Sequence, residues 1–433
     1  MESKSRILYI VYWGATEPLG RSLVLPAVKR LANLGASLTL VTFEKRDDLA
    51  KGQDIAEIAA DLKEHGIEWV PLHYHKTPKV PATAYDIARG VAAGLAVRLR
   101  TTPHIIHART FIGGLIGLTL SRLLGARLIY HNEGFYPDEQ VDAGVWASGS
   151  VPHRIAKRLE LTLYSRADGI IAASNRGREV IEHLPAVRRK STPVIVVPSC
   201  VDLDRFQVPP GGGTREHGLR LVYCGSVGGR YRLQNVARFA AVAAEKVHPV
   251  TLRVLTRSDR AFVEALLRAG GLGEEQWSVD SIAHSEIPDV LSRYDAGVHF
   301  LAQGISDHGG SPTKVGEYLA AGLPVVVTPN LGDADAIIRK EGVGVLVDDW
   351  SEPMLRKAVE DLQTLLQDPA LASRCRAAAE MYYSLQPACE RQIRLYEHLS
   401  SRPSAIAPGS IPFDWATVDE SGHSAVLSED LKR

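Results

Sequence analysis

The sequence predicts an α/β fold built from two doubly wound parallel sheets. Three observations predict it: apolar strand-like runs alternate with amphipathic helix-like segments, this alternation stops at a break, and it then starts again. The break contains Pro209-Pro210-Gly211-Gly212-Gly213, a composition with little capacity to form a packed element. Two domains are also expected for a chain of 433 residues, which is too long for one ordinary core.

The first half alternates short apolar runs with periodic stretches, as parallel strands joined by crossover helices do. Strands are expected at 7–11, 37–43, 68–71, 104–107, 127–130, 169–172 and 194–197. Helices are expected near 23–34, 54–65 and 113–124, up to about 166, and from 176.

The second half repeats this alternation. Strands are expected at 220–223, 251–256, 277–279, 297–301 and 325–326, with helices near 236–246, 260–270, 287–294 and 313–321. We therefore expect an N-terminal domain over 1–205, a second domain over 206–385, a helix over 386–401 that returns to the first domain, and a flexible tail over 402–433. Parallel sheets bind ligands at the carboxyl ends of their strands, so a ligand cleft is expected between the two domains.

The composition and the lengths of the apolar runs argue against several classes of protein. Lys plus Arg and Asp plus Glu each number 50, so no overall field favours nucleic acid as a partner. The apolar run at 7–11 is too short for a signal peptide, and no window has the length of a transmembrane helix, so a cytoplasmic protein is expected. The cysteines are scattered without metal-ligand spacing and are expected to be buried thiols: Cys200, Cys224, Cys375 and Cys389.

The most informative motif runs from Ser311 to Val326. Ser311 is expected to cap a helix, Pro312 to lie in its first turn and Gly322 to end it before a strand. Free N–H groups at such a terminus, with Lys314 beside them, suit a diphosphate, and Glu317 one turn further on suits the hydroxyls of a ribose. The ordinary alternative is a weak surface pair of Lys314 and Glu317.

Several further landmarks occur in a fixed order over roughly residues 6 to 400, within the few-residue error of such boundaries. They are Glu17-Pro18-Leu19-Gly20-Arg21-Ser22, His107-Ala108-Arg109-Thr110, the runs 164–172 and 197–206, Tyr223-Cys224-Gly225-Ser226, Tyr294-Asp295-Ala296-Gly297-Val298 and the motif at 311–326. In this order they resemble the GT-B glycosyltransferases, specifically the retaining family 4 enzymes.

The resemblance implies roles for the donor half. Glu317 matches the family glutamate that holds the ribose, and Lys314 and Arg230 would neutralise the diphosphate. The remaining donor-binding residues that the resemblance implies are Gly20, Gly225, Ser226, Ile282, Ser311, Pro312 and Thr313, with His131 matching a histidine that contacts the donor sugar.

The chain also departs from the family pattern. The family's first glutamate corresponds to Gly309, for which Asp307 or His308 could substitute. Ser226 stands where an arginine is usual, so Arg230 takes the diphosphate role only by hypothesis. What replaces the missing glutamate decides the specificity for the donor sugar.

The residues that would bind the acceptor are harder to identify from the sequence. Polar side chains follow the expected strands 104–107 and 127–130, and loops at strand ends often carry function. Candidate acceptor residues are Glu17, His107, Arg109, Glu133 and Asp138. For His107 a buried core histidine is the alternative interpretation, favoured nearly as strongly as contact with a ligand. The three carboxylates Glu133, Asp138 and Glu139 favour an acceptor that carries positive charge.

The sequence thus predicts a retaining, hexosyltransferase-like enzyme that uses a UDP- or GDP-sugar, needs neither cofactor nor metal, and acts on a small polar or saccharide acceptor as a monomer or homodimer. The Asp333-Ala334-Asp335 triplet has the spacing of a metal clamp but is interpreted as a helix start. The alternatives are a nucleotide-sugar epimerase or hydrolase of the same shape, and a non-catalytic nucleotide-sugar-binding protein. A nicotinamide enzyme is disfavoured because no expected strand is followed by GxGxxG.

Overall fold

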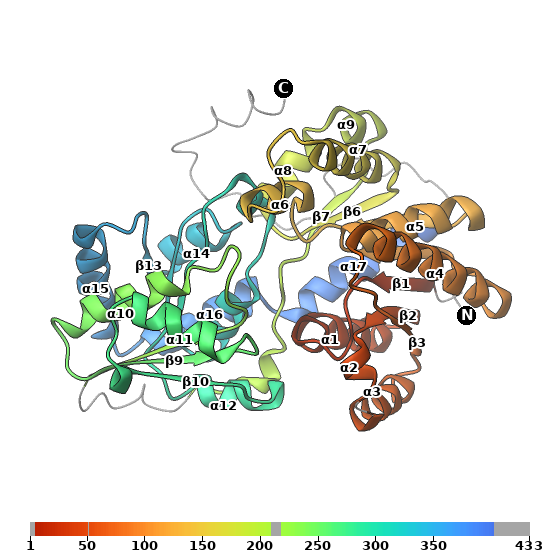
Figure 1. Ribbon diagram of the computed structural model, residues 1–433. Helices are drawn as coiled ribbons and strands as arrows, with labels where there is room; N and C mark the ends of the chain where they lie inside the picture. The colour runs from red at the N-terminus through yellow and green to blue at the C-terminus, as the bar shows by residue number, and fades with distance from the viewer. Residues whose placement is uncertain (1–4, 51, 209–217, 402–433) are drawn as a thin grey trace. The chain divides into compact units, whose positions relative to one another are not determined.

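The computed structural model describes residues 5–50, 52–208 and 218–401. It contains two parallel sheets with helices packed against them (Figure 1). The first has seven strands in the order β3-β2-β1-β4-β5-β6-β7, and the second has six in the order β10-β9-β8-β11-β12-β13. In both sheets the chain changes direction beside the first strand, at β1 and at β8. This is the doubly wound arrangement, and it confirms the predicted fold class.

The first sheet and its helices occupy the chain up to the expected break. Its strands are β1 (Arg6–Val11), β2 (Ser37–Glu44), β3 (Glu68–His73), β4 (Ile105–Arg109), β5 (Arg127–His131), β6 (Gly169–Ala172) and β7 (Val194–Val196). Its helices are η1 (Gly20–Val24), α1 (Leu25–Asn33), α2 (Arg46–Leu49), α3 (Gly52–Glu64), α4 (Lys79–Arg100), α5 (Phe111–Leu124), α6 (Tyr136–Asp142), α7 (Val151–Arg166), α8 (Asn175–Glu182), α9 (Pro185–Lys190) and η2 (Leu203–Arg205).

The second sheet begins directly after residue 217. Its strands are β8 (Leu219–Cys224), β9 (Val250–Leu255), β10 (Trp277–Asp280), β11 (Ala296–His299), β12 (Val325–Val327) and β13 (Gly344–Leu346). The helices of this half are α10 (Leu233–Ala244), α11 (Arg260–Ala269), η3 (Glu274–Gln276), η4 (His284–Glu286), α12 (Ile287–Leu291), η5 (Ile305–Gly309), α13 (Thr313–Ala320), α14 (Ala334–Glu341), α15 (Glu352–Leu366), α16 (Leu371–Tyr382) and α17 (Leu385–Ser400).

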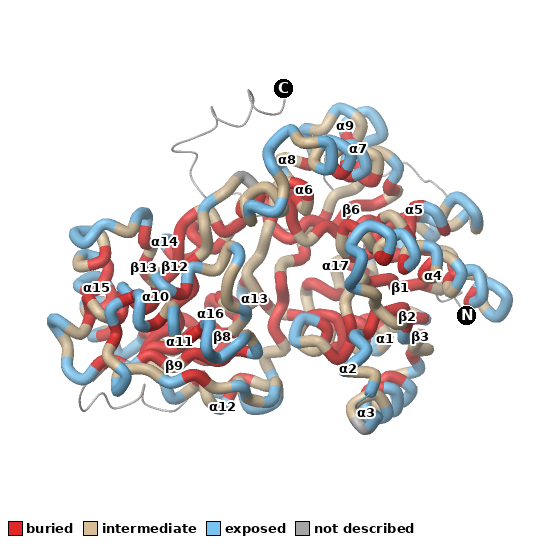
Figure 2. The backbone as a smooth tube through the Cα atoms, viewed as in Figure 1, coloured by how far each residue is buried: buried red, intermediate tan, exposed pale blue. Residues whose placement is uncertain are grey.

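The central strands are buried on both faces, as their unbroken apolar runs require (Figure 2). Alternate residues of β1 enter two different cores: Tyr9 packs with α1 and α3, and Leu8 packs with α5 and α7. Helix α17 supplies Leu395 and Tyr396 to the first of these cores. The last described helix therefore packs against the first sheet, although the domain limits at 205 and 385 stay predictions.

Some expectations were incomplete. Helices α4, α15 and α16 and strand β13 were not predicted, and the helices near 287–294 and 23–34 are shorter than expected, the second because a π-helical turn, η1, precedes α1. The interpretation of Asp333-Ala334-Asp335 is confirmed, because α14 begins at Ala334. All four cysteines are buried and free, as predicted. The Pro/Gly-rich run at 209–213 and the tail from 402 lie outside the described residues.

Candidate active site

The predicted anion site at the start of α13 has a different helix cap from the one expected. Pro312 occupies the N-cap position, and no side chain accepts a hydrogen bond there. The expectation that Ser311 caps the helix is wrong, because Ser199 engages it instead. The Ser199 amide donates to Ser311 Oγ at 3.1 Å, and Ser199 Oγ donates to the Ser311 carbonyl at 2.6 Å. The first N–H groups of α13 therefore lack a side-chain cap, which leaves them able to bind an anion.

Lys314 lies directly across Gly225, at the end of β8. A Cβ atom on Gly225 would be 2.1 Å from Lys314 Cε, and the φ of +136° at Gly225 also excludes most other residues. Lys314 Nζ stands 4.7 Å from the centre of the Tyr231 ring. The missing side chain at Gly225 thus lets the ammonium group reach the helix terminus, and Tyr231 supports it by a cation–π contact.

Glu317 lies one turn further along α13 and is 8% exposed. Burial raises the pKa of its carboxyl to about 7, although the charges of Lys314 and Arg205 act in the opposite direction. No hydrogen-bond donor from the described residues contacts this carboxylate. A buried carboxylate without a donor is costly unless a ligand supplies one, so Glu317 is suited to accept from a hydroxyl group.

Arg230 forms an ion pair with Asp307 in η5. The Gly304 amide fixes Asp307 by donating to its Oδ2 at 2.8 Å. Burial raises the pKa of Asp307, and Arg230 opposes that shift. Arg230 Nε is buried without a hydrogen-bond partner in the described structure. An unfilled buried donor of this kind is consistent with a ligand that the arginine binds.

Gly309, at the position of the family's first glutamate, packs against Phe135. A Cβ atom at Gly309 would lie 2.8 Å from Phe135 Cε2, so a glutamate there would displace the ring. Of the two possible substitutes, Asp307 is engaged by Arg230, and the backbone carbonyl of His308 accepts from Ser174 Oγ at 2.7 Å. Asp307 is thus the acidic group that lies nearest to the expected diphosphate arginine.

The remaining residues expected to bind the donor lie in loops or at the start of α13. Arg205 holds the loop of Ile282 by donating to the His284 carbonyl at 2.7 Å. Burial and the Arg205 charge lower the pKa of His284 to about 4. Ile282 is half-buried, and Ser226 is exposed, its carbonyl accepting from the Tyr223 hydroxyl. Pro312 and Thr313 are half-buried at the start of α13.

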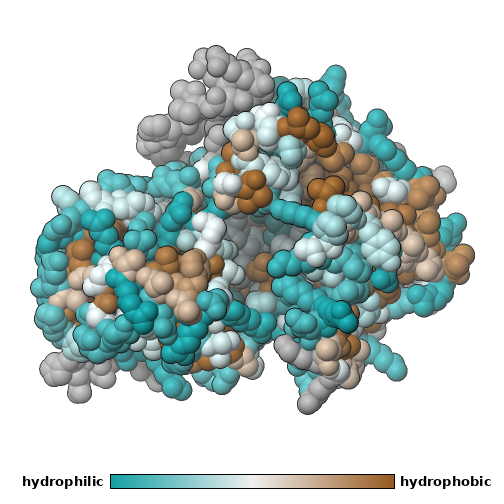
Figure 3. Space-filling model, in the orientation of Figure 1, coloured by the Kyte–Doolittle hydropathy of each residue, from teal (hydrophilic) through white to brown (hydrophobic). Residues whose placement is uncertain are grey.

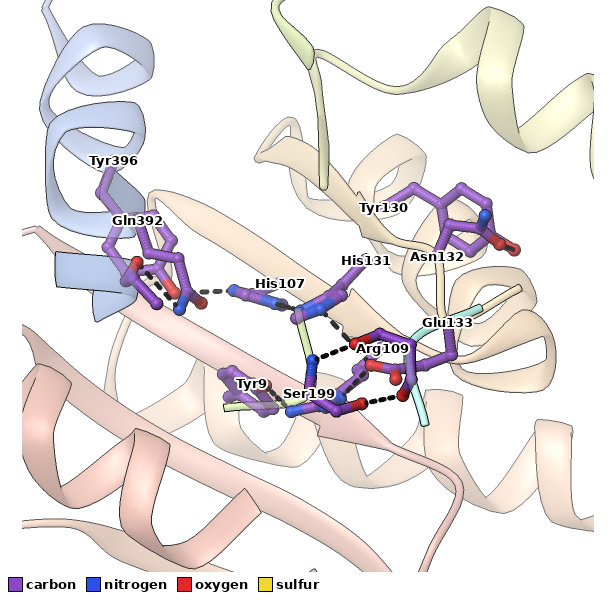
Figure 4. Close-up of polar contacts among 12 residues, drawn as sticks. Tyr9, His107, Arg109, Tyr130, His131, Asn132, Glu133, Ser199, Gln392 and Tyr396 are labelled. Carbon is purple, nitrogen blue, oxygen red and sulfur yellow. Dashed lines mark hydrogen bonds and ion pairs between the residues drawn. The ribbon is translucent and has the colours of Figure 1, made fainter. Parts of the chain in front are cut away.

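A buried polar chain runs along the ends of β4 and β5 (Figure 4). The Tyr396 hydroxyl is 2.6 Å from His107 Nδ1, and His107 Nε2 is 3.0 Å from His131 Nδ1. His131 Nε2 is 3.3 Å from Glu133, which also pairs with Arg109. Burial and the positive charge of Arg109 hold the pKa of both histidines well below the ordinary value. Both imidazoles are therefore neutral at physiological pH.

The structure bears on the two interpretations of His107. Its ring is fully buried and both nitrogens are engaged, as expected for a buried core histidine, and its contact with an acceptor stays a prediction. The same holds for the nitrogens of His131, whose side chain is 2% exposed. The contact of His131 with a donor sugar stays a prediction.

The predicted acceptor carboxylates are paired with protein cations. Glu133 pairs with Arg109, Asp138 pairs with Lys157, and Glu17 lies 3.3 Å from Lys45 Nζ. Burial raises the pKa of Glu17 despite the opposing charge of Lys45. Because these charges are already compensated, the argument for a cationic acceptor is weakened.

Gly20 is required by the protein's own packing. A Cβ atom there would be 2.0 Å from the Gly14 carbonyl oxygen, so only glycine lets η1 begin against this loop. The loop is fixed by Glu44, a fully buried residue that sequence reasoning missed. Glu44 accepts from the Ala15 amide and from Thr16 Oγ1, both at 2.7 Å. Its position, directly after the expected apolar strand 37–43 and at the end of β2, was the available signal.

Helix α6 contributes two acidic residues besides Asp138: Glu139, one of the three carboxylates expected to favour a cationic acceptor, and Asp142, to which the sequence analysis assigned no role. Glu139 is half-buried near Arg230, and burial raises its pKa to about 7. Asp142 accepts from the Ser306 amide at 3.1 Å and from Ser306 Oγ at 2.6 Å. These contacts hold α6, which follows β5 of the first sheet, against η5, which follows β11 of the second sheet. Residues from both halves of the chain therefore meet around Arg230.

Comparisons with known proteins agree with this geometry. A family described as Glycosyltransferase Family 4 matches residues 23–205, and one described as Glycosyl transferases group 1 matches residues 218–365. A search of curated proteins found no match.

Similar solved structures share the fold at low sequence identity. Sucrose-phosphate synthase from Thermosynechococcus elongatus has 16% identity and a TM-score of 0.66, covering 92% of this chain and 99% of that one. Anabaena Alr3699/HepE in complex with UDP and glucose has 15% identity and a TM-score of 0.62, covering 91% and 99%. A putative UDP-N-acetylglucosamine 2-epimerase from Listeria monocytogenes has 14% identity and a TM-score of 0.57, covering 92% and 96%. With two family matches that together span most of its length, this chain belongs to the GT-B glycosyltransferases, with a family 4 amino-terminal part and a group 1 carboxyl-terminal part.

Proposed function

We propose that this protein transfers a hexosyl group from a UDP- or GDP-sugar to a small polar or saccharide acceptor, with retention of configuration and without a metal. The observation that carries the proposal is the start of α13. There, uncapped N–H groups, Lys314 across Gly225, and the donor-free carboxylate of Glu317 lie within one helical turn.

This arrangement suits the charge that develops during glycosyl transfer. As the bond to the anomeric carbon breaks, negative charge grows on the leaving diphosphate, and fixed positive groups stabilise it. The helix terminus, Lys314 and Arg230 would supply that stabilisation. Glu317 would accept from the ribose hydroxyls, and the resulting hydrogen bonds would offset its buried charge.

UDP is the preferred nucleotide of the two. The support is the similarity to Anabaena HepE, whose structure was solved with UDP and glucose. A binding titration with UDP and GDP separates the two bases directly.

Retention is supported by the pairing of Glu133, Asp138 and Glu17 with protein cations, because a paired carboxylate is a poor general base. In a retaining reaction the leaving phosphate oxygen takes the acceptor's proton instead. Glu139 is the candidate for a protein base, because its raised pKa of about 7 would suit that role, and its substitution therefore tests retention. If Glu139→Gln abolishes transfer while UDP binding persists, and the product is inverted by NMR, retention is refuted.

The proposal is tested with purified protein and a panel of UDP- and GDP-sugars, with nucleotide release and glycosylated product as readouts. Lys314→Ala is expected to weaken UDP binding by roughly tenfold or more, because the substitution removes a charge-assisted contact with the diphosphate. Lys340→Ala is the matched control, because Lys340 also lies over an aromatic ring, at 6.0 Å from that of Tyr382. Absence of UDP and GDP binding in the unmodified protein would overturn the proposal.

An epimerase or hydrolase of the same shape is the second candidate, and the similarity to the Listeria putative epimerase favours it. Incubation of a UDP-sugar without acceptor distinguishes the activities. Free sugar or an epimerised nucleotide sugar would identify this second activity, and binding without any turnover would indicate a non-catalytic protein.

A further inference from the structure

Helix α4 exposes an apolar stripe along its whole length. Most of its exposed positions are apolar and follow a helical spacing, and its exposed charged residues, Lys79, Arg98 and Arg100, lie at the two ends. The exposed apolar positions are Val80, Pro81, Ala84, Tyr85, Ala88, Ala92, Leu95, Ala96 and Leu99. Val80 is 77% exposed and Leu99 is 88% exposed. Side chains this apolar on the outside of a long helix indicate a surface that something covers.

The stripe is not a side effect of loose packing, because the inner face of α4 fits closely against α5. A Cβ atom on Gly90 would be 2.8 Å from Ile116 Cδ1, and one on Gly94 would be 2.4 Å from Leu120 Cδ1. The two glycines thus let α4 lie directly on α5, so the inner side of α4 is already packed against that helix. On the outer side the Tyr85 ring contacts the His75 ring, with 5.0 Å between centroids, whereas Val80, Leu95 and Leu99 are exposed to solvent in the described structure.

Neighbouring helices extend the same surface. Leu123, near the end of α5, is 60% exposed, and α7 exposes Val151, Ile155 and Leu159 on successive turns. Figure 3 shows the hydrophobic colour gathered over the part of the molecule where α4, α5 and α7 lie. We call this surface, formed by the outward residues of α4, Leu123, and the exposed apolar residues of α7, the apolar face.

The exposed charged groups on the three helices of the apolar face are basic, and one of them, Arg100, pairs with Glu68 of β3 at 2.9 Å. Helices α4 and α7 each contain four Lys or Arg residues and α5 contains one, against a single carboxylate in α4 and a single one in α7. Both carboxylates are buried: Asp86 accepts from Tyr12 at 2.8 Å, and Glu160 pairs with Lys157 at 2.9 Å. The exposed charges on these three helices are therefore cations, among them Arg98, Arg122, Arg154 and Arg158.

We propose that the apolar face docks on a membrane surface that contains anionic lipid. Apolar side chains would enter the headgroup region, and the arginines would pair with lipid phosphates. A second copy of this chain fits the face less well, because a twofold interface would set one cationic rim against another. No helix in the described part of the chain has the length and apolar character to cross a bilayer, so the contact would be peripheral.

Sedimentation with lipid vesicles tests this proposal, with vesicles of phosphatidylcholine alone and of phosphatidylcholine mixed with phosphatidylglycerol. The full chain is expected to bind the mixed vesicles, and binding is expected to fall as salt is raised. The double variant Leu95→Glu/Leu99→Glu, and separately Ile155→Glu, are each expected to lower binding by roughly tenfold or more. These side chains are exposed, so circular dichroism should be unchanged.

Met381→Glu is the matched control, because Met381 is 59% exposed on α16, far along the chain from the apolar face. It should bind vesicles like the unmodified protein. Equal loss in this control, or no binding of mixed vesicles by the unmodified chain, overturns the proposal. A dimer of the unmodified chain that Leu95→Glu/Leu99→Glu converts to monomers, without vesicle binding, would assign the face to a second copy instead.

Discussion

Glu317 connects ligand binding with stability through its raised pKa. In the folded protein its pKa is about 7, above the ordinary 4.5, so between these values the folded state binds more protons than the unfolded state. Stability is therefore expected to fall as pH rises through this window, because the buried carboxylate becomes charged. A bound ribose would offset that cost by donating hydrogen bonds.

The variant Glu317→Gln separates the two effects. At pH 8 it is expected to unfold with a free energy about 1–3 kcal/mol higher than the unmodified protein, and at pH 5 with little difference. Its UDP affinity is expected to fall by roughly tenfold. Thermal unfolding at both pH values and calorimetric titration measure these quantities. A variant that is less stable at pH 8, or that binds UDP normally, would contradict this role.

Gly225 offers a second test at the residue scale. In Gly225→Ala the new methyl group would collide with Lys314, so the ammonium group should move and UDP binding should weaken by roughly tenfold. Gly229→Ala is the control, since Gly229 also has a positive φ, of +60°, but no atom lies within 4 Å of its Cβ position. Both substitutions cost backbone strain, of about 1–2 kcal/mol. Equal UDP affinity in the two variants would contradict the placement of Lys314.

At the scale of elements, the contact of η5 with the segment before α6 leaves little room for a side chain at Gly309. Gly309→Ala is expected to destabilise the protein by about 1–3 kcal/mol, because the methyl group must displace the Phe135 ring. In a Phe135→Ala background the same substitution should cost less, with a coupling of about 0.5–3 kcal/mol in a double-mutant cycle. Additive effects, measured by denaturant unfolding, would show that the ring does not fill the site.

Helix α17 is joined to the polar chain of the first sheet through Tyr396. Tyr396→Phe would leave His107 Nδ1 buried without its partner, at a cost of about 1–3 kcal/mol. Tyr85→Phe on α4, where the ring is 54% exposed, should leave stability unchanged. If the two variants have the same unfolding free energy, the hydrogen bond contributes nothing.

The elements that escaped prediction have identifiable causes. Helix α4 is apolar on its outer side, so it lacks the polar face that marks an amphipathic helix, and Gly90 and Gly94 inside it are weak helix formers. The cap at Pro312 was misassigned because Ser199, more than a hundred residues earlier in the chain, engages Ser311. Contacts so distant in sequence leave no local signal.

For the molecule as a whole, the two sheets could be predicted because their strands are continuous apolar runs between turn residues, as in β1 and β12. The placement of Lys314 and Glu317 at the start of α13 could be predicted because a helix start, a lysine and a glutamate one turn apart are close in sequence. The acceptor half could not, because the environments of His107, Glu133 and Asp138 depend on ion pairs and packing between separate elements.

The central claim is that a nucleotide diphosphate binds at the start of α13, and a crystal structure of the protein with UDP tests it most directly. We expect the diphosphate within hydrogen-bonding distance of Lys314 Nζ and the first N–H groups of α13, with a ribose hydroxyl donating to Glu317. Density for UDP at any other place, or a ribose without contact to Glu317, would contradict the account.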